Sequence, residues 1–137
     1  MKLQERTEVV VRFNETDPLG IVWHGHYVRY FEDGREGFGK RYGLGYLDCY
    51  KHEIAIPVVS LQCDYRKPLR YGDVVSVETS FLPKNAAKIE FGYRILREDG
   101  ELIASGSSTQ VFVHIRTFQL QLTNPEFYEV WKRKWGL

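Results

Sequence analysis

One acidic residue stands in a turn-prone segment directly before a long helical pattern. Asp17 belongs to "NETDPLG", and His24 follows it by seven residues. Free backbone N–H groups at a helix start carry partial positive charge and stabilise an oxygen that becomes negative during a reaction. A carboxylate folded back toward such a helix start is placed to act as a nucleophile or general base. The competing interpretation is that Asp17 only caps its turn, as aspartates often do.

Two other kinds of site find less support. His24 and His26 form an H-x-H pair that could join Asp17 and His52 in a metal site, but this spacing is weak and no cysteine lies close enough to support it. None of the serines lies in a G-x-S-x-G segment. The sequence therefore predicts neither a metal site nor a serine hydrolase triad.

A basic segment is the candidate for binding an anionic ligand. "YRKPLRYGD" holds three cations within five positions, Arg66, Lys67 and Arg70, and two lysines follow one hairpin later, Lys84 and Lys88. Cations with interleaved tyrosines suit the phosphates and adenine of coenzyme A, although a charge run of this size is usually a solvated face. The sequence contains no P-loop and no G-x-G-x-x-G segment, so ATP or NAD binding by those routes is not expected.

Length and charge limit the classes of function. At 137 residues the chain has the length of one domain, and we expect residues 1–137 to fold as a single unit. The net charge of +1 gives no general attraction to nucleic acid or membranes. No apolar run approaches the roughly 20 residues of a bilayer span. The polar start and the two cysteines, Cys49 and Cys63, point to the cytoplasm.

The elements that must position these residues follow from hydrophobic periodicity. Residues 7–13 favour a first strand, and apolar residues recur at helical spacing from His26 to about Arg41. Three glycines interrupt this helix, Gly34, Gly37 and Gly39. Each costs about 1 kcal/mol relative to alanine, which indicates the close approach of a neighbouring backbone.

Extended patterns dominate the rest of the chain. After a short second helix in "YGLGYLDCYKHE", we expect strands in "IAIPVVSLQCDYR", "DVVSVETSFLP", "AAKIEFGYRILRE" and "ELIASGSSTQVFVHIR". Asp99 and Gly100 predict a hairpin between the last two. "TNPEFYEVWKRKWG" predicts a final helix capped by Thr123 or Asn124, with Pro125 in its first position. One long helix laid across an antiparallel sheet is an α+β architecture, and the half-apolar strands favour a homodimer that covers the second sheet face.

The segment "VRFNETDPLGIVWHGHYVRYFEDGRE" resembles the signature of the hot-dog-fold acyl-CoA thioesterases of the 4-hydroxybenzoyl-CoA thioesterase type. In that family a T-D-x-x-G-x-V segment precedes a Y-x-x-x-x-E-x-x-R helix, and the matching residues here are Thr16, Asp17, Gly20, Val22, Tyr27, Glu32 and Arg35. "YRKPLRYGDVVSVET" is similar to the family's basic, proline-containing strand entry. The resemblance implies an antiparallel sheet wrapped around one long central helix. It also implies a dimer with sheets joined edge to edge, or a dimer of dimers, with active sites at the subunit interface.

The resemblance also implies roles for particular residues. The family's catalytic carboxylate falls on Asp17. The backbone N–H that polarises the thioester carbonyl falls on His24 or Gly25, and the His24 side chain supports catalysis. No cofactor is implied. Contacts with the acyl-CoA substrate are expected from a larger set: Trp23, Tyr27, Ser60 of the partner chain, Arg66, Lys67 and Arg70. Trp23 is bulkier than in some relatives, which leaves the acyl preference open.

The chemistry of a thioester agrees with one carboxylate and one oxyanion site. A thiolate, whose parent thiol has a pKa of about 8.5, departs more easily than an alkoxide, so a strong general acid is dispensable. Whether Asp17 attacks the carbonyl or deprotonates water stays open, because both routes require the same placement. Two other classes stay open: a non-catalytic acyl-CoA-binding module, and a hot-dog dehydratase of hydroxyacyl thioesters, for which the sequence offers no matching motif.

Overall fold

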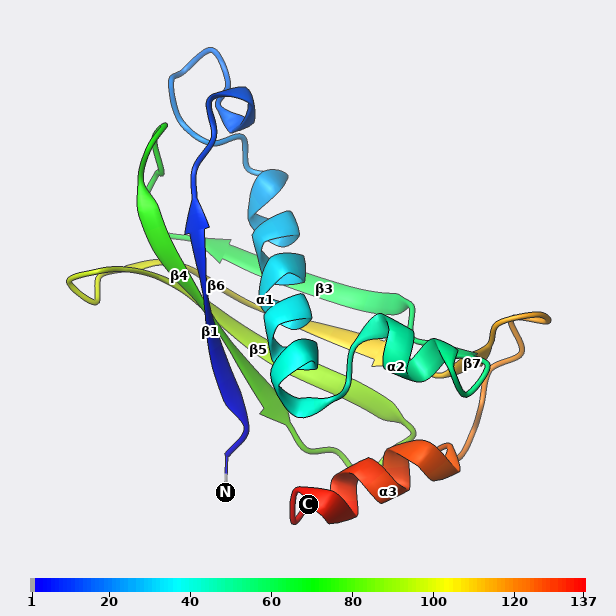
Figure 1. Ribbon diagram of the computed structural model, residues 1–137. Helices are drawn as coiled ribbons and strands as arrows, with labels where there is room; N and C mark the ends of the chain where they lie inside the picture. Colours follow the sequence, from blue (N-terminus) through cyan, green and yellow to red (C-terminus); the bar gives the residue numbers. More distant parts are fainter. Residues whose placement is uncertain (1) are drawn as a thin grey trace.

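One long helix lies across a face of a five-stranded antiparallel sheet in the computed structural model, which describes residues 2–137 (Figure 1). The helix is α1 (His26–Tyr42). The strands, in spatial order, are β1 (Gln4–Val10), β4 (Val74–Leu82), β5 (Lys88–Arg97), β6 (Leu102–Val111) and β3 (Val58–Tyr65). The smaller elements are a 3-10 helix (Phe13–Glu15), α2 (Tyr46–Tyr50), β2 (Ile54–Ala55), β7 (Val113–His114) and α3 (Glu126–Lys134). The α+β architecture expected from the sequence is confirmed.

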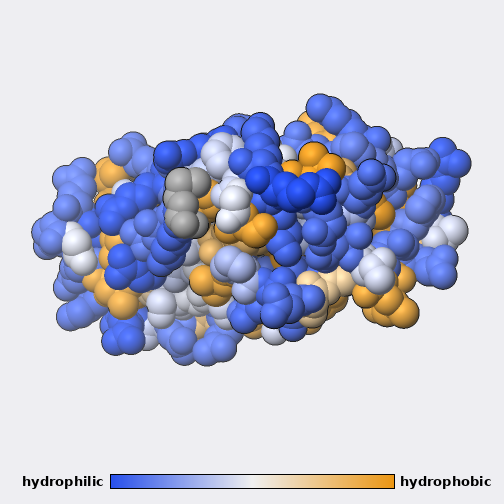
Figure 2. Space-filling view, turned by 90° about the horizontal axis from the view of Figure 1, so that it is seen from below, coloured by the Kyte–Doolittle hydropathy of each residue, from blue (hydrophilic) through white to orange (hydrophobic). Residues whose placement is uncertain are grey.

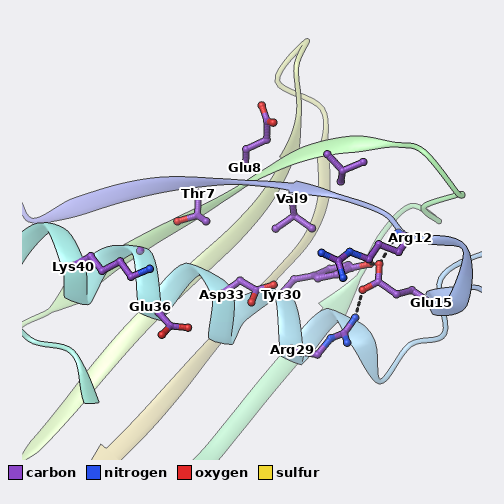
Figure 3. Close-up of a pocket in the computed structure, with 12 residues that line it drawn as sticks. Thr7, Glu8, Val9, Arg12, Glu15, Arg29, Tyr30, Asp33, Glu36 and Lys40 are labelled. Carbon is purple, nitrogen blue, oxygen red and sulfur yellow. Dashed lines mark hydrogen bonds and ion pairs between the residues drawn. The ribbon is translucent and has the colours of Figure 1, made fainter. Parts of the chain in front are cut away.

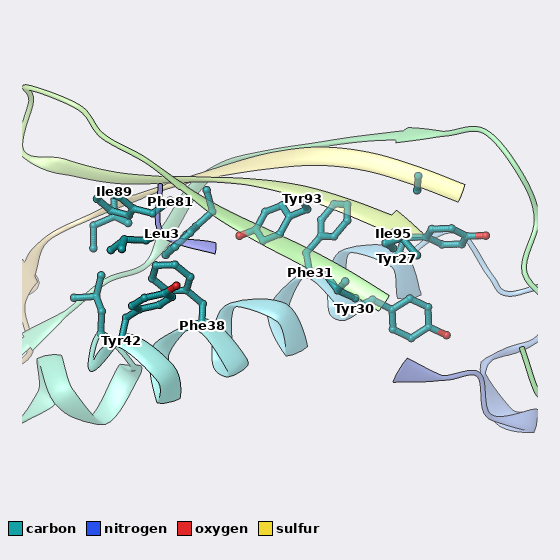
Figure 4. Close-up of a cluster of buried hydrophobic side chains, with 14 of the residues drawn as sticks. Leu3, Tyr27, Tyr30, Phe31, Phe38, Tyr42, Phe81, Ile89, Tyr93 and Ile95 are labelled. Atoms are coloured by element: carbon teal, nitrogen blue, oxygen red, sulfur yellow. The ribbon is translucent and has the colours of Figure 1, made fainter. Parts of the chain in front are cut away.

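Aromatic side chains fill the space between α1 and the sheet (Figure 4). Phe31 stacks on Tyr93 of β5 with ring centroids 4.5 Å apart, and Phe38 meets Phe91 edge to face at 5.1 Å. Burial of a side chain of this size stabilises a fold by about 1.5–3 kcal/mol, so this layer holds α1 on the sheet. The start of α1 is thereby fixed relative to the strand ends around it.

The three glycines of α1 do allow close approach, although mostly of side chains. A Cβ on Gly39 would come within 2.7 Å of the backbone of Gly45, as expected. A Cβ on Gly34 would meet side chains of β4, and one on Gly37 would meet Thr7 of β1. The expectation of a neighbouring backbone is therefore confirmed at Gly39 and wrong at the other two positions, where the helix lies directly on sheet side chains.

Several element boundaries differ from the expected ones. The first strand begins at Gln4 and ends at Val10, earlier at both ends than expected. It ends there because the Glu15 carboxylate accepts a hydrogen bond from the Arg12 N–H, which turns the chain out of the sheet. The expected strand in residues 54–66 is divided into β2 and β3 at Pro57, which has no N–H to donate to a ladder. The strand in residues 101–116 is likewise divided, because β7 leaves the main sheet to pair with β2.

The hairpin expected at Asp99 and Gly100 is confirmed, with Gly100 at φ 90 and the Glu101 N–H bonded to Asp99 Oδ1. The final helix begins one residue later than expected, because Pro125 is extended and serves as the N-cap. From this helix, the indole N–H groups of Trp131 and Trp135 donate to the Tyr42 carbonyl, at 2.7 and 3.1 Å.

The face of the molecule seen from below is mostly hydrophilic, with separate apolar patches (Figure 2). Within residues 2–137, every helix is too short or too polar to cross a membrane.

Candidate active site

Asp17 lies in a tight loop that doubles back before α1 begins. Thr16 pairs with Val22 in an antiparallel bridge, and the Asp17 N–H donates to the Ile21 carbonyl at 2.8 Å. Asp17 Oδ1 accepts a hydrogen bond of 2.9 Å from the Leu19 N–H, whereas Oδ2 has no hydrogen-bond partner among residues 2–137. The loop that doubles back was expected from the sequence. Among the described residues, one oxygen of Asp17 caps the turn and the other is unpaired.

The helix that follows starts with unpaired backbone donors. Gly25 is the N-cap of α1, and no side chain caps this end. The N–H groups of His26 and Tyr27 donate to the carbonyls of Trp23 and His24, at 2.9 and 3.4 Å. Within the described chain, the N–H groups of His24 and Gly25 donate to no acceptor. Two adjacent donors at the positive end of the helix dipole are therefore available to a developing oxyanion.

The indole ring of Trp23 packs against the two residues that carry these donors. Its centroid lies 5.0 Å from that of His24 and 5.5 Å from that of His26, and the side chain is 48% exposed. A Cβ on Gly25 would overlap the indole ring. Gly25 has ordinary helical angles, φ −67 and ψ −21, so a side chain here would meet the Trp23 ring and no backbone restriction.

The end of β3 supports the same helix start. The Tyr65 hydroxyl donates a hydrogen bond of 2.7 Å to the His24 carbonyl, and its ring packs edge to face on Tyr27 at 4.9 Å. Burial, and to a smaller extent a contact with Cys63, raises the pKa of Tyr65 to about 12, so the phenol remains a donor at neutral pH. Sequence reasoning missed this role, because 41 residues separate Tyr65 from His24 and the local sequence carries no signal of their contact.

The basic segment also lies alongside the start of α1. The Val22 N–H donates to the Leu69 carbonyl at 2.8 Å, and the Tyr27 hydroxyl donates to the Lys67 carbonyl at 3.4 Å. The three cations of this segment are exposed: Arg66, Lys67 and Arg70. The structure therefore brings the expected coenzyme A contacts and the Asp17 loop to the same end of the molecule.

Ser60 lies apart from this site within one chain. It is an exposed residue near the start of β3, about 16 Å from Tyr65 at the usual rise of roughly 3.3 Å per residue. Alternation along the strand also places Ser60 on the opposite sheet face from Tyr65. Within one chain Ser60 therefore does not reach the site, and its expected contact with the substrate stays a prediction.

The remaining residues considered in the sequence lie at other ends of the fold. Lys84 and Lys88 follow the far end of β4, so the nine residues of that strand separate them from Arg70. His52 follows α2 and stacks on Phe127 of α3 at 4.6 Å. In Figure 1, α2 and α3 lie toward the C-terminal end of α1, whereas His24 precedes its first residue. No group of three or more His, Cys, Asp or Glu residues suited to a metal ion occurs in residues 2–137.

A family model and several known proteins match most of the chain in sequence. A family model described as the thioesterase-like superfamily matches residues 11–130. A protein of Bacillus subtilis (strain 168) named "Putative acyl-CoA thioesterase YneP" is 33% identical over 131 residues, which are 93% of this chain and 95% of the relative. A 1,4-dihydroxy-2-naphthoyl-CoA hydrolase of Prochlorococcus marinus (strain MIT 9211) is 30% identical over 102 residues, 67% of this chain and 66% of the relative.

Solved structures agree with the architecture. A DHNA-CoA thioesterase from Staphylococcus aureus matches with a TM-score of 0.86 and 29% identity, over 98% of this chain and 92% of that one. A mutant of 4-hydroxybenzoyl CoA thioesterase, complexed with 4-hydroxybenzoyl CoA, matches with a TM-score of 0.81 over 94% and 98% of the two chains. At 20% identity this second likeness concerns the fold alone. The hot-dog fold expected from the sequence is confirmed.

Proposed function

This chain belongs to the thioesterase-like superfamily and is an acyl-CoA thioesterase, and we propose that Asp17 is the carboxylate with which it hydrolyses its substrate. One observation carries the proposal: a loop that leaves one Asp17 oxygen unpaired leads directly into a helix start with two unpaired N–H donors, at His24 and Gly25. A nucleophile or base and an oxyanion site are the two parts that thioester hydrolysis requires.

The reaction uses these parts in one of two ways. In both, the thioester oxygen accepts hydrogen bonds from the N–H groups of His24 and Gly25 as it becomes negative. Asp17 Oδ2 either attacks the carbonyl carbon, forming an anhydride that water then cleaves, or removes a proton from the water that attacks. Each route breaks the C–S bond, releases coenzyme A as a thiolate and yields the free acid.

We further propose that the active unit is a homodimer, alone or as half of a dimer of dimers, joined through β3. This edge strand pairs only with β6 in the described chain, so one side of its backbone lacks partners. Four of its apolar side chains are exposed, Val58, Val59, Leu61 and Tyr65. A second copy pairing antiparallel with β3 would satisfy the backbone and bury these side chains.

Such pairing would complete the site. In two antiparallel β3 strands paired over their full length, the Tyr65 end of one lies beside the Val58 end of the other. Val58 borders a groove of about 750 Å³ along the C-terminal half of α1, lined in part by Ile56, Phe91 and Gln110. Because the Tyr65 hydroxyl donates a hydrogen bond to the His24 carbonyl, the dimer would bring each helix start to the partner's groove. That groove is our candidate for holding the acyl group.

Coenzyme A would lie over the basic segment, where Arg66, Lys67 and Arg70 are exposed beside the start of α1. Their charges match the phosphates of coenzyme A. A cytoplasmic location is also part of the proposal, because both Cys49 and Cys63 are free thiols and the cytosol keeps thiols reduced.

The test compares two aspartates that cap turns in the same way. Asp17→Asn should lower kcat on the best acyl-CoA by about 100-fold or more, because it removes the nucleophile or base. Asp99→Asn is the matched control, since Asp99 Oδ1 also accepts a hydrogen bond of 2.9 Å from the N–H two residues later. If Asp17→Asn kept more than about a tenth of kcat, the proposed role would be wrong. Tight acyl-CoA binding without turnover by the unaltered protein would favour the binding module instead.

A further inference from the structure

Glu15 is a buried carboxylate at the base of the Asp17 loop. It is 6% exposed, and its side chain reaches back over the loop to α1 (Figure 3). Oε1 accepts hydrogen bonds from the Arg12 N–H at 2.7 Å and from the Tyr30 hydroxyl at 2.9 Å. Oε2 forms an ion pair with Arg29. The carboxylate thus has three partners, and two of them belong to the first turns of α1.

The backbone of Glu15 closes the other side of the same loop. Its carbonyl accepts a hydrogen bond of 3.0 Å from the Trp23 N–H, next to the bridge between Thr16 and Val22. Glu15 and Trp23 therefore form the neck of the loop that carries Asp17. Trp23 is also the residue whose ring lies over Gly25.

We infer that Glu15 is a positioning residue for catalysis: it fixes the neck of the Asp17 loop to the helix that supplies the oxyanion donors. The inference rests on the proposed function of Asp17. Through its backbone Glu15 holds the loop, and through its side chain it holds Arg29 and Tyr30. A single buried residue thus connects the reacting carboxylate with the N–H groups that it must face.

The surroundings of Glu15 suit a fixed anion. Arg29 supplies the opposite charge, and burial raises the pKa of Tyr30 to about 12, so its hydroxyl remains a donor at working pH. The cluster borders a groove of about 480 Å³ between β1 and α1, which Asp33 and Arg12 also line. Arg29 is half exposed toward this groove, whereas the Glu15 carboxylate is covered. Removing one partner would leave the other buried charge or donor without a partner and loosen the neck.

Glu78 provides a matched control elsewhere in the fold. It is 5% exposed and paired with two arginines, Arg6 at 3.0 Å and Arg94 at 2.8 Å. Its neighbours Val77 and Thr79 lie against Gly34 of α1, so alternation places Glu78 on the sheet face away from the helix. Glu78→Gln therefore removes an equally buried carboxylate with ion pairs, without touching the Asp17 loop.

The test measures kcat and KM of Glu15→Gln and Glu78→Gln at a temperature where thermal melting shows both to be folded. Glu15→Gln should lower kcat by about tenfold or more with KM changed less than about threefold, because misplacement of a reacting group by a fraction of an ångström affects the transition state most. Glu78→Gln should leave kcat within about twofold of the original protein. Arg29→Met should reproduce the loss, and the double variant should be no slower than the slower single one, because the pair acts as a unit.

Amide hydrogen exchange gives a readout that does not depend on turnover. Glu15→Gln should speed exchange in residues 16–23, where the Asp17 and Trp23 N–H groups hold the loop closed, and Glu78→Gln should not. An unchanged kcat in Glu15→Gln, with Asp17→Asn inactive, would overturn the positioning role alone. Full activity of Asp17→Asn would overturn the proposed function, whatever Glu15→Gln does. Equal losses of kcat in Glu15→Gln and Glu78→Gln would mean that Glu15 only stabilises the fold.

Discussion

The indole ring of Trp23 lies against Gly25 so closely that a Cβ at this N-cap of α1 would displace the ring. The two free N–H groups belong to His24 and Gly25, the residues against which this ring packs. A helix start that must receive a carbonyl oxygen needs its first N–H groups free, since a side-chain cap would occupy the same donors. The absence of a side-chain cap at this end of α1 is consistent with the proposed oxyanion site.

Gly25→Ala should lower kcat by about tenfold or more, because the added methyl displaces the indole ring and the backbone donors beside it. The control is the same change in a Trp23→Ala background, where the methyl has room. There Gly25→Ala should cost less than about threefold in kcat, and the two changes should be non-additive. Steady-state kinetics of the four proteins check this, and additive losses would contradict the steric explanation.

Replacing Arg66 or Arg70 with alanine should raise KM for acyl-CoA by about three- to tenfold and leave kcat nearly unchanged, because phosphate contacts act equally in the ground and transition states. The salt dependence of KM should also become weaker, since exposed charge pairs are screened by salt. Lys84→Ala is the control, because Lys84 pairs with Glu90 beyond the far end of β4. If KM in these variants matched that of the control, the basic segment would be a solvated surface and not a binding site for coenzyme A.

A charge introduced into β3 should separate the proposed dimer. Leu61 is exposed in the single chain at 45%, and Leu61→Glu would place a carboxylate inside the strand pairing. We expect a monomer by light scattering and a loss of activity of about 100-fold, because each site would lack its second chain. Leu122→Glu is the control, since Leu122 is also exposed and lies outside β3. Full activity in a monomeric Leu61→Glu protein would exclude shared sites.

Glu78 should make stability depend on pH in the acid range. Its hydrogen bond to Arg94, with a smaller contribution from Arg6 and some opposition from burial, holds the pKa below the usual 4.5. A lowered pKa in the folded state stabilises it above about pH 4.5, and this contribution is lost as the pH falls through the folded-state pKa.

Urea unfolding of the original protein and Glu78→Gln checks this dependence. The original protein should be more stable by about 1 kcal/mol at pH 7, and the difference should shrink as the pH falls below about 4.5. A difference that stayed constant as the pH fell through the acid range would mean that the carboxylate charge contributes nothing to it.

The sequence by itself determined the main elements and the reaction class. The helical spacing from His26 placed α1, the Asp99–Gly100 pair placed a hairpin, and the turn at Asp17 placed the carboxylate before the helix. These inferences succeed because each depends on residues within a few positions of one another, whose backbone preferences are local. The same locality explains the family resemblance, since each of the two motifs that carry it lies within one short segment of the chain.

Only the tertiary structure showed what surrounds that motif. Tyr65 reaches the His24 carbonyl across 41 residues, and the glycines of α1 make room for side chains of β1 and β4 that nothing in the helix sequence identifies. Glu15 lies two residues from Asp17 in sequence, yet its burial and its bonds to Arg29 and Tyr30 exist only once α1 lies against the first strand. Local patterns in the sequence specify where helices, strands and turns form. Which side chains are buried, and which groups they bond to, depends on packing between elements that are distant in the chain.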